Sequence, residues 1–264
     1  MSSRVNFTDA IKIRENLVFL IFSISFFLAS WLVANVEIGP SVIWVSAIFI
    51  LLLALPSYYY LLKTIEIRIG FLVLIIFSIF PIIIEAIGVS TGIPYGGFHY
   101  SDELGFKIAG LVPWSVIFAF APLLIGSYSI SSQVTDDVRL VIPFSAFLLV
   151  LVDMVLDPAA VILNIWEWDV PGPYYGIPLT NYSGWFITAI IGLILLHFMI
   201  NGSSAEVALI DPRIASSILI ATAFWTGFSF WTGLIIPTII GGLVIIFVFH
   251  LILFRNPSVV KPIT

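Results

Sequence analysis

Long apolar segments separated by short polar ones run through the whole chain. Eight of these segments have a length and hydropathy typical of membrane-spanning helices, at about 17–35, 41–62, 69–87, 107–128, 139–156, 184–200, 213–231 and 233–254. The pattern therefore predicts an all-α fold, a polytopic membrane bundle of about eight transmembrane helices. No linker-like segment separates these windows, so we expect a single integral membrane domain, residues 1–264.

The basic residues fall unevenly on the two sides that eight spans define. One side, which also holds both termini, carries nine of the ten: Arg4, Lys12, Arg14, Lys63, Arg68, Arg139, Arg213, Arg255 and Lys261. Only Lys107 falls on the other side. Because cytoplasmic loops are enriched in lysine and arginine, we expect a multi-pass protein of the cell membrane with both termini cytoplasmic.

Two loops rich in glycine, proline and tyrosine then lie on the non-cytoplasmic side. Residues 88–106 contain GIPYGGFHYS, and residues 157–183 contain GPYYGIPLTNYSG. Both are longer than simple connectors and aromatic, so we expect extramembrane loops that fold back over a cavity. A span, an acid and a Gly-Pro-Tyr-Gly loop occur twice, which suggests an internal repeat of 69–128 and 139–200.

Composition narrows the functions that this architecture could serve. The chain is 61% hydrophobic and 9% charged, with a mean hydropathy of +1.17 and a net charge of −5. The basic residues form no cluster, so we expect no nucleic-acid partner. The absence of cysteine rules out disulfides and thiolate ligands, and no two histidines have ligand spacing, so we expect no metal site.

Three carboxylic acids stand out because they lie inside or at the edge of apolar windows: Glu85, Asp153 and Asp157. A charged side chain within a membrane segment costs roughly 2.5–3.5 kcal/mol on insertion scales, so such acids usually have a function. Asp153 and Asp157 are four residues apart and share one face of a helix, where repulsion would keep one of them protonated. Glu85 has a simpler alternative, which is to point from the membrane interface toward the headgroups.

Capping offers an alternative for one of the two aspartates. Asp157-Pro158 fits a helix N-cap followed by proline at the first helical position, as Asp211-Pro212 does before the seventh window. Asp153 lies one turn deeper and has no capping role to explain it. A capping role for Asp157 and a functional one could coexist.

Polar and aromatic side chains of the two loops accompany the acids. We expect those that contact a substrate to include Tyr95, His99, Tyr100, Trp166, Trp168, Tyr174, Tyr175 and Asn181. The alternative for the aromatic residues is an interfacial belt, and for His99 an ordinary interfacial position. Ser101, followed by Asp102 and Glu103, also fits a capped start of the fourth span.

Two stretches at these loops resemble the carotenoid 1,2-hydratase family of membrane proteins. They are 85-EAIGVSTGIPYGGFHYSDELGFKIAGLVP and 153-DMVLDPAAVILNIWEWDVPGPYYGIPLTNYSGW, roughly a quarter of the chain. The second is the more specific, since Leu-Asp-Pro, Trp-x-Trp, Tyr-Tyr-Gly-x-Pro and Asn-x-x-Gly-Trp follow in order. Phe98 stands where the family is expected to have tyrosine, which leaves no hydroxyl there. The family is itself similar, at a distance, to membrane-bound lycopene cyclases.

The resemblance implies a lyase-type hydratase of carotenoid biosynthesis. Its substrate would be a lipid-soluble carotenoid in membrane lipid, and water would add to the terminal C=C of an acyclic end group to give a tertiary alcohol. That reaction needs a protonated acid and a base, but no cofactor. Asp153 or Glu85 would be the acid, and Asp157 or the other acid the base.

Two other functions fit the same residues. In a lycopene-type cyclase, an internal alkene would replace water as the nucleophile after the same protonation step. A proton-coupled transporter would also place acids and broken helices within the membrane. Against a transporter, the acids lie toward one side and no polar stripe continues to the other.

Overall fold

A computed structural model describes residues 7–36, 44–204 and 210–254 of the chain. These residues form eight α-helices: α1 (Phe7–Asn35), α2 (Trp44–Thr64), α3 (Ile67–Thr91), α4 (Val116–Ser132), α5 (Val138–Ile162), α6 (Leu179–Asn201), α7 (Ser216–Trp231) and α8 (Ile235–Phe254). Six of the helical segments are long and apolar enough to cross a membrane. The other two are shorter apolar helices, namely α4 and the Ile48–Thr64 part of α2. The predicted all-α membrane bundle is therefore confirmed.

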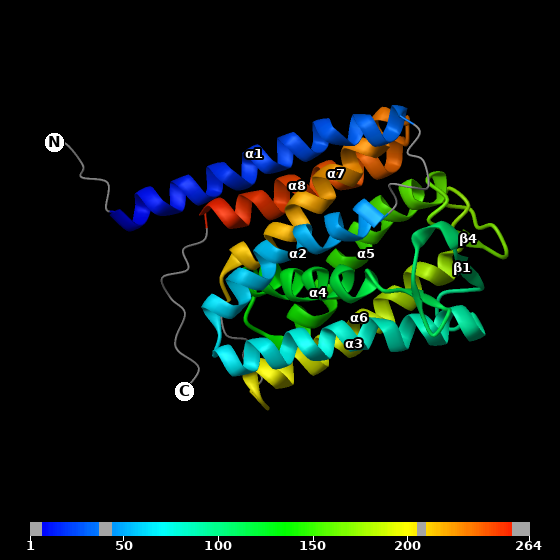
Figure 1. Ribbon diagram of the computed structural model, residues 1–264. Coiled ribbons are helices and arrows are strands. Elements are labelled where there is room, and N and C mark those ends of the chain that lie inside the picture. The colour runs from blue at the N-terminus through cyan, green and yellow to red at the C-terminus, as the bar shows by residue number, and fades with distance from the viewer. Residues whose placement is uncertain (1–6, 37–43, 205–209, 255–264) are drawn as a thin grey trace.

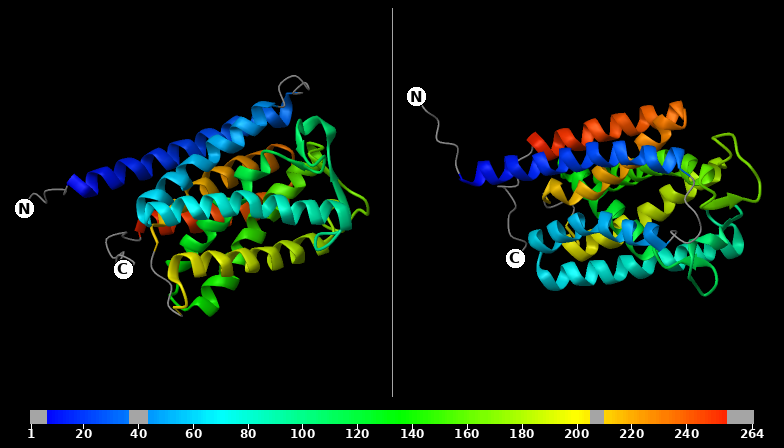
Figure 2. Two further views of the ribbon diagram at one scale, coloured as in Figure 1. Left: turned by 60° about the horizontal axis from the view of Figure 1, so that its bottom comes forward. Right: turned by 45° about the horizontal axis from the view of Figure 1, so that its top comes forward.

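The bundle has two distinct ends (Figures 1 and 2). The first turn of α1 and the last turn of α8 lie at one end, and the short strands β1 and β4 lie at the other. Of the basic residues that predict the membrane orientation, Arg4, Arg255 and Lys261 lie outside the described residues. Which end faces the cytoplasm therefore stays a prediction.

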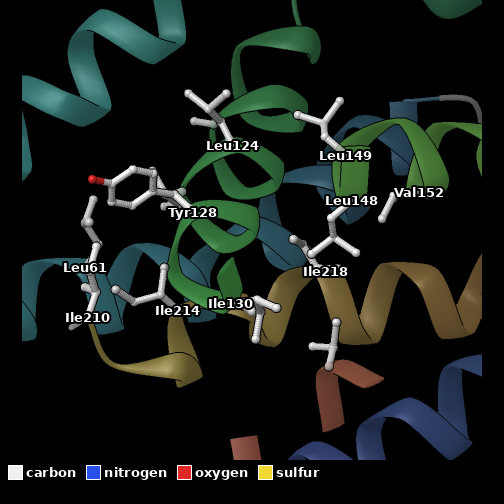
Figure 3. Close-up of a cluster of buried hydrophobic side chains, with 14 of the residues drawn as sticks. Leu61, Leu124, Tyr128, Ile130, Leu148, Leu149, Val152, Ile210, Ile214 and Ile218 are labelled. Carbon is white, nitrogen blue, oxygen red and sulfur yellow. The ribbon is translucent and has the colours of Figure 1, made fainter. Parts of the chain in front are cut away.

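Helix α4 forms the centre of the bundle and contacts α2, α3, α5, α6 and α7. Nearly all of its residues from Phe120 onward are buried. Figure 3 shows the apolar cluster around this helix, in which α4 packs against α5 and α7 through Leu124, Tyr128, Ile130, Leu148, Leu149, Val152 and Ile218. The outer helices instead expose large apolar side chains, as expected where lipid replaces water.

Helix α3 carries two stripes of opposite character. One stripe is buried and recurs every three or four residues: Gly70, Val73, Phe77, Pro81, Glu85 and Gly88. The other is exposed and recurs every four residues: Ile75, Ile79, Ile83 and Ile87. Since side chains at these spacings share a helix face, Glu85 points into the bundle and not toward the headgroups.

The two aromatic loops pair with each other. Strand β1 (Phe98–Tyr100) of the first loop and strand β4 (Trp166–Trp168) of the second are antiparallel, with Phe98 opposite Trp168 and Tyr100 opposite Trp166. Because side chains alternate along a strand, Phe98 and Tyr100 turn inward and His99 turns outward. Each half of the predicted repeat thus supplies one strand of the β1–β4 pair. The repeat itself stays a prediction.

The fourth span begins later than predicted, at Val116 and not near residue 107. The preceding residues form a 3₁₀ turn, η2 (Asp102–Leu104), and a small hairpin of β2 (Lys107–Ile108) with β3 (Val112–Pro113). Three residues there have a positive φ, which an α-helix does not allow: Gly105, Ala109 and Gly110. The prediction that Ser101 caps this span is therefore wrong.

Helix α5 is also longer than its predicted window, 139–156. It continues through Asp157 and Pro158 to Ile162, so the capping interpretation of Asp157 is wrong. Proline has no amide hydrogen, and a proline at 158 leaves the carbonyl of Met154 without its helical partner. The hydroxyl of Tyr174 donates a hydrogen bond to that carbonyl at 3.0 Å, which explains how the helix tolerates the proline.

Asp211 behaves as the sequence predicts. Its carboxylate accepts a hydrogen bond from the backbone amide of Arg213 at 2.9 Å and caps the 3₁₀ turn η3 (Pro212–Ala215) that leads into α7. The two Asp-Pro pairs of the chain therefore differ, because one begins a helix and the other lies inside one.

Candidate functional site

The three predicted acids lie in one buried cluster near the loop end of the bundle. Glu85, Asp153 and Asp157 are 4%, 9% and 2% exposed. Glu85 on α3 is close enough to both aspartates on α5 for electrostatic interaction across the helices. Among the described residues, none of the three forms an ion pair with a basic side chain.

Asn181 joins the two aspartates. Its amide nitrogen Nδ2 lies 2.5 Å from Oδ2 of Asp157 and 3.3 Å from Oδ2 of Asp153. Asn181 belongs to the first turn of α6 and is itself buried. A carboxamide nitrogen carries two hydrogens, so it can donate one to each carboxyl group. The structure therefore brings together Asn181 and two of the acids predicted from the sequence.

Glu85 has a separate partner from the first loop. The hydroxyl of Tyr100 donates a hydrogen bond to Oε2 of Glu85 at 3.0 Å. Burial of the ring, and then the neighbouring Glu85, raise the pKa of Tyr100 well above its usual value. Tyr100 consequently keeps its proton and remains a hydrogen-bond donor.

Tyr95 fills the seam between α3 and α6. An added Cβ at Gly88 of α3 would lie 2.7 Å from Cδ2 of its ring, and one at Gly184 of α6 would lie 2.8 Å from Cδ1. The Tyr95 hydroxyl is 3.1 Å from Oγ1 of Thr188. Both glycines are therefore needed for this ring to reach the interior beside the carboxylates, where it interacts electrostatically with Glu85 and Asp153.

Further aromatic rings pack around Tyr100 and along the β1–β4 pair. The ring centroids of Tyr100 and Trp166 are 6.0 Å apart in an edge-to-face arrangement, and those of Phe98 and Trp168 are 5.2 Å apart. Phe98 thus contributes packing at the position where the family resemblance leads to an expectation of tyrosine. Tyr174 completes the group on the side of the second loop. The faces of such rings can stabilise a cation that forms over them.

Two predicted residues lie apart from the carboxylates. The side chain of His99 is 59% exposed, and its Nδ1 is 3.4 Å from Oδ1 of Asp169 on the outer face of the β1–β4 pair. The hydroxyl of Tyr175 instead accepts a weak hydrogen bond, 3.4 Å long, from the backbone amide of Ile236 at the start of α8. Their substrate-binding roles stay predictions.

The substrate contacts expected from the sequence do not include Tyr182, which counts there only among the aromatic residues around the second loop, or Thr188. Tyr182 follows Asn181 in the first turn of α6, is 9% exposed and interacts electrostatically with Asp157 and Asp153. Its hydroxyl faces Asp157 but forms no hydrogen bond of ordinary geometry. The available signal was its position next to Asn181, but an adjacent residue on a helix ordinarily points elsewhere.

No group of three or more histidine, cysteine, aspartate or glutamate side chains within the described ranges is arranged to hold a metal ion.

An apolar groove of about 290 Å³ lies between α5 and α8, lined by Phe144, Phe147, Leu148, Leu151, Ile240, Leu243, Val244 and Phe247. On α5 its lining residues lie roughly opposite Asp153 and Asp157 around the helix axis, so this groove is separate from the carboxylate cluster.

The chain is similar to proteins of carotenoid biosynthesis. A family described as carotenoid biosynthesis protein matches residues 42–248 of the chain. Bisanhydrobacterioruberin hydratase of Haloarcula japonica is 31% identical over 163 residues, which are 59% of this chain and 55% of that protein. The match therefore spans about half the length of this curated relative. No solved structure matches the chain.

Proposed function

The chain belongs to the carotenoid biosynthesis protein family, and on this basis we propose that it is a carotenoid hydratase. The reaction would add water across the terminal C=C of an acyclic carotenoid end group and give a tertiary alcohol. The activity for which the haloarchaeal relative is named supports the hydratase class. The observation that carries the proposal is the pair of buried aspartates held by Asn181 near Glu85, with no basic partner among the described residues.

Burial limits how many of the three carboxyl groups can be ionised at the same time. An ionised carboxylate without a paired cation is costly in an apolar interior, so we infer that only one of the three is charged at neutral pH. Asn181 lies closest to Asp157, at 2.5 Å, and a short donor contact favours a negative charge. We therefore assign Asp157 as the carboxylate base and its neighbour Asp153 as the carboxylic acid, with Glu85 as the alternative acid.

The proposed reaction has two steps. In the first, the acid transfers its proton to the less substituted carbon of the terminal C=C, so that a C–H bond forms and a tertiary carbocation remains. In the second, a water oxygen bonds to the cationic carbon while Asp157 takes one water proton. A proton then returns from Asp157 to the acid, which restores the starting state without any oxidation or group transfer.

The surroundings of the acids suit such an intermediate. Tyr100 hydrogen-bonds to Glu85 and packs edge-to-face against Trp166, so aromatic rings lie close to this acid, and ring faces attract cations. The negative charge on Asp157 adds electrostatic stabilisation in a site of low dielectric. The carotenoid end would reach this place from the lipid beneath the paired loops. No cofactor is required by this chemistry.

Expression in a bacterial host that accumulates acyclic C40 and C50 carotenoids tests the proposal. We expect pigments that are heavier by the mass of one water per reacted end, as read by chromatography with mass spectrometry. Asp153→Asn should abolish the product, and the matched control Asp136→Asn, in a loop remote from the acids, should not. Cyclised pigment of unchanged mass would instead identify a cyclase. Unaltered pigment beside folded protein would refute both activities and leave the transporter.

A further inference from the structure

Two buried polar atoms near the loop end of the bundle have no hydrogen bond of ordinary geometry: the hydroxyl oxygen of Tyr182, which faces Asp157, and the indole nitrogen Nε1 of Trp168. Buried polar groups in native proteins are nearly always paired, with protein atoms or with ordered water. Leaving such a group unpaired in the interior is energetically costly. These two atoms therefore indicate a polar ligand that the protein side chains alone do not supply.

Both side chains belong to the same small cluster. Tyr182, from α6, packs there with Ile177 and Val150, and Trp168, from β4, packs against the same group. The cluster adjoins the aspartates, because Tyr182 interacts electrostatically with Asp157 and, more weakly, with Asp153. Tyr182 thus brings a hydroxyl without an ordinary hydrogen bond to the edge of the carboxylate cluster, and Trp168 adds a second unpaired polar atom to the apolar cluster that contains Tyr182.

A water molecule would match the hydrogen-bonding capacities of three groups: the Asp157 carboxylate, the Trp168 indole and the Tyr182 hydroxyl. A carboxylate only accepts, an indole only donates, and a tyrosine hydroxyl does both. A buried water typically makes about three hydrogen bonds, and these three groups would provide them. A carotenoid end group, by contrast, has no polar atom that could satisfy either the hydroxyl or the indole.

We propose that Tyr182, assisted by Trp168, holds the water molecule that attacks the carbocation. This proposal rests on the hydratase function proposed above. The water oxygen donates an electron pair to form the C–O bond, and one of its protons moves to Asp157. Tyr182 keeps its own proton throughout and fixes the water by hydrogen bonding, so the protons and electrons of the step balance without another reactant.

A carbocation without a held water has other fates. It can lose a proton to give an isomeric alkene, or an internal alkene can attack it to form a ring. Replacing Tyr182 should therefore change which product forms. A residue that only supported the fold would instead lower the amounts of all products together.

The test is the ratio of alcohol to water-free products, isomerised or cyclised, in carotenoid-accumulating cells that express Tyr182→Phe. We expect this ratio to fall at least about tenfold, as for the loss of a hydrogen bond worth about 1.4 kcal/mol. Tyr58→Phe is the matched control, because Tyr58 of α2 also carries a buried, unpaired hydroxyl but lies outside the site. Its ratio should equal that of the wild type.

Other outcomes separate this proposal from the hydratase function. Alcohol as the sole product of Tyr182→Phe, at any rate, would overturn the water-holding role. A folded Tyr182→Phe variant that consumes no substrate would also overturn this role, because Tyr182 would then be needed before water attacks the carbocation. If Tyr182→Phe does not accumulate in the membrane, Trp168→Phe is read by the same ratio, with a wild-type ratio overturning the proposal. Failure of the wild type to form alcohol would refute the hydratase itself.

Discussion

The hydroxyl of Tyr174 donates a hydrogen bond to the main-chain carbonyl of Met154, across the boundary between the second loop and α5. Met154 follows Asp153 directly, and its carbonyl would normally bond to the amide of residue 158, which is proline. The bond therefore supports the helical turn that carries both aspartates. The aromatic loop is in this way part of the scaffold of the acids as well as their cover.

Tyr174→Phe should lower stability, because it leaves this partly buried carbonyl without a donor, at a cost of up to about 1–3 kcal/mol. Thermal unfolding in detergent would show a lower apparent midpoint than for the wild type. In a Pro158→Ala background the restored amide can bond to the carbonyl, so the same substitution should cost clearly less. Equal costs in both backgrounds would mean that Tyr174 does not replace the missing amide.

Asn181→Ala should reduce hydration roughly ten- to hundredfold, because it removes the donor of both aspartates and charge-assisted bonds are worth about 1.5–3 kcal/mol. The alcohol formed per unit of membrane protein measures the effect. Asn201→Ala is the matched control on the same helix, where Asn201 bonds to Tyr128 far from the acids. A similar loss in both variants would point to general damage of α6.

Gly184→Ala should disrupt the site, since the new Cβ would lie 2.8 Å from both the Pro94 carbonyl oxygen and the Tyr95 ring. Displacement of Tyr95 should reduce activity as well as the unfolding temperature. Gly242→Ala in α8 is the control, because its Cβ would meet nothing within 4 Å. The control should be neutral or stabilise by up to about 1 kcal/mol. Identical behaviour of the two variants would argue against close packing at Gly184.

Cysteine substitutions can test the loop pairing and the membrane orientation in this cysteine-free chain. His99→Cys with Glu167→Cys should form a disulfide on mild oxidation, because the two residues are directly opposite in the β1–β4 register and exposed.

In intact cells, a membrane-impermeant thiol reagent should label His99→Cys but not Ser203→Cys at the other end of the bundle. Reversed labelling would overturn the predicted orientation.

Much of this architecture could be predicted from local patterns. The lengths of apolar windows identify all eight helices of the part of the chain that the structure describes, and the spacing of Asp153 and Asp157 places them on one face. The rarity of acids in such windows is enough to single out the three members of the carboxylate cluster. These features can be predicted because contact with lipid constrains the polarity of each residue in a span, whichever distant segments that residue also contacts.

Other features depend on contacts between distant segments. Asp157-Pro158 has the local pattern of a helix start, but Tyr174 supplies the donor that allows α5 to continue. The strands β1 and β4 are three residues long, too short for a periodic signal, and pair only because both loops meet. The position of Tyr182 likewise becomes meaningful only when α6 packs beside α5.

Isotope incorporation tests the central claim, proton transfer from a buried carboxyl followed by water attack, most directly. Membranes containing the protein would be given an acyclic carotenoid in heavy-oxygen water or in deuterium oxide. We predict one heavy oxygen, or one carbon-bound deuterium, per reacted end, with none from Asp153→Asn and the full amount from Asp136→Asn. Alcohol whose oxygen does not come from water, or wild-type incorporation by variants of Asp153 and of Glu85 alike, would contradict that mechanism.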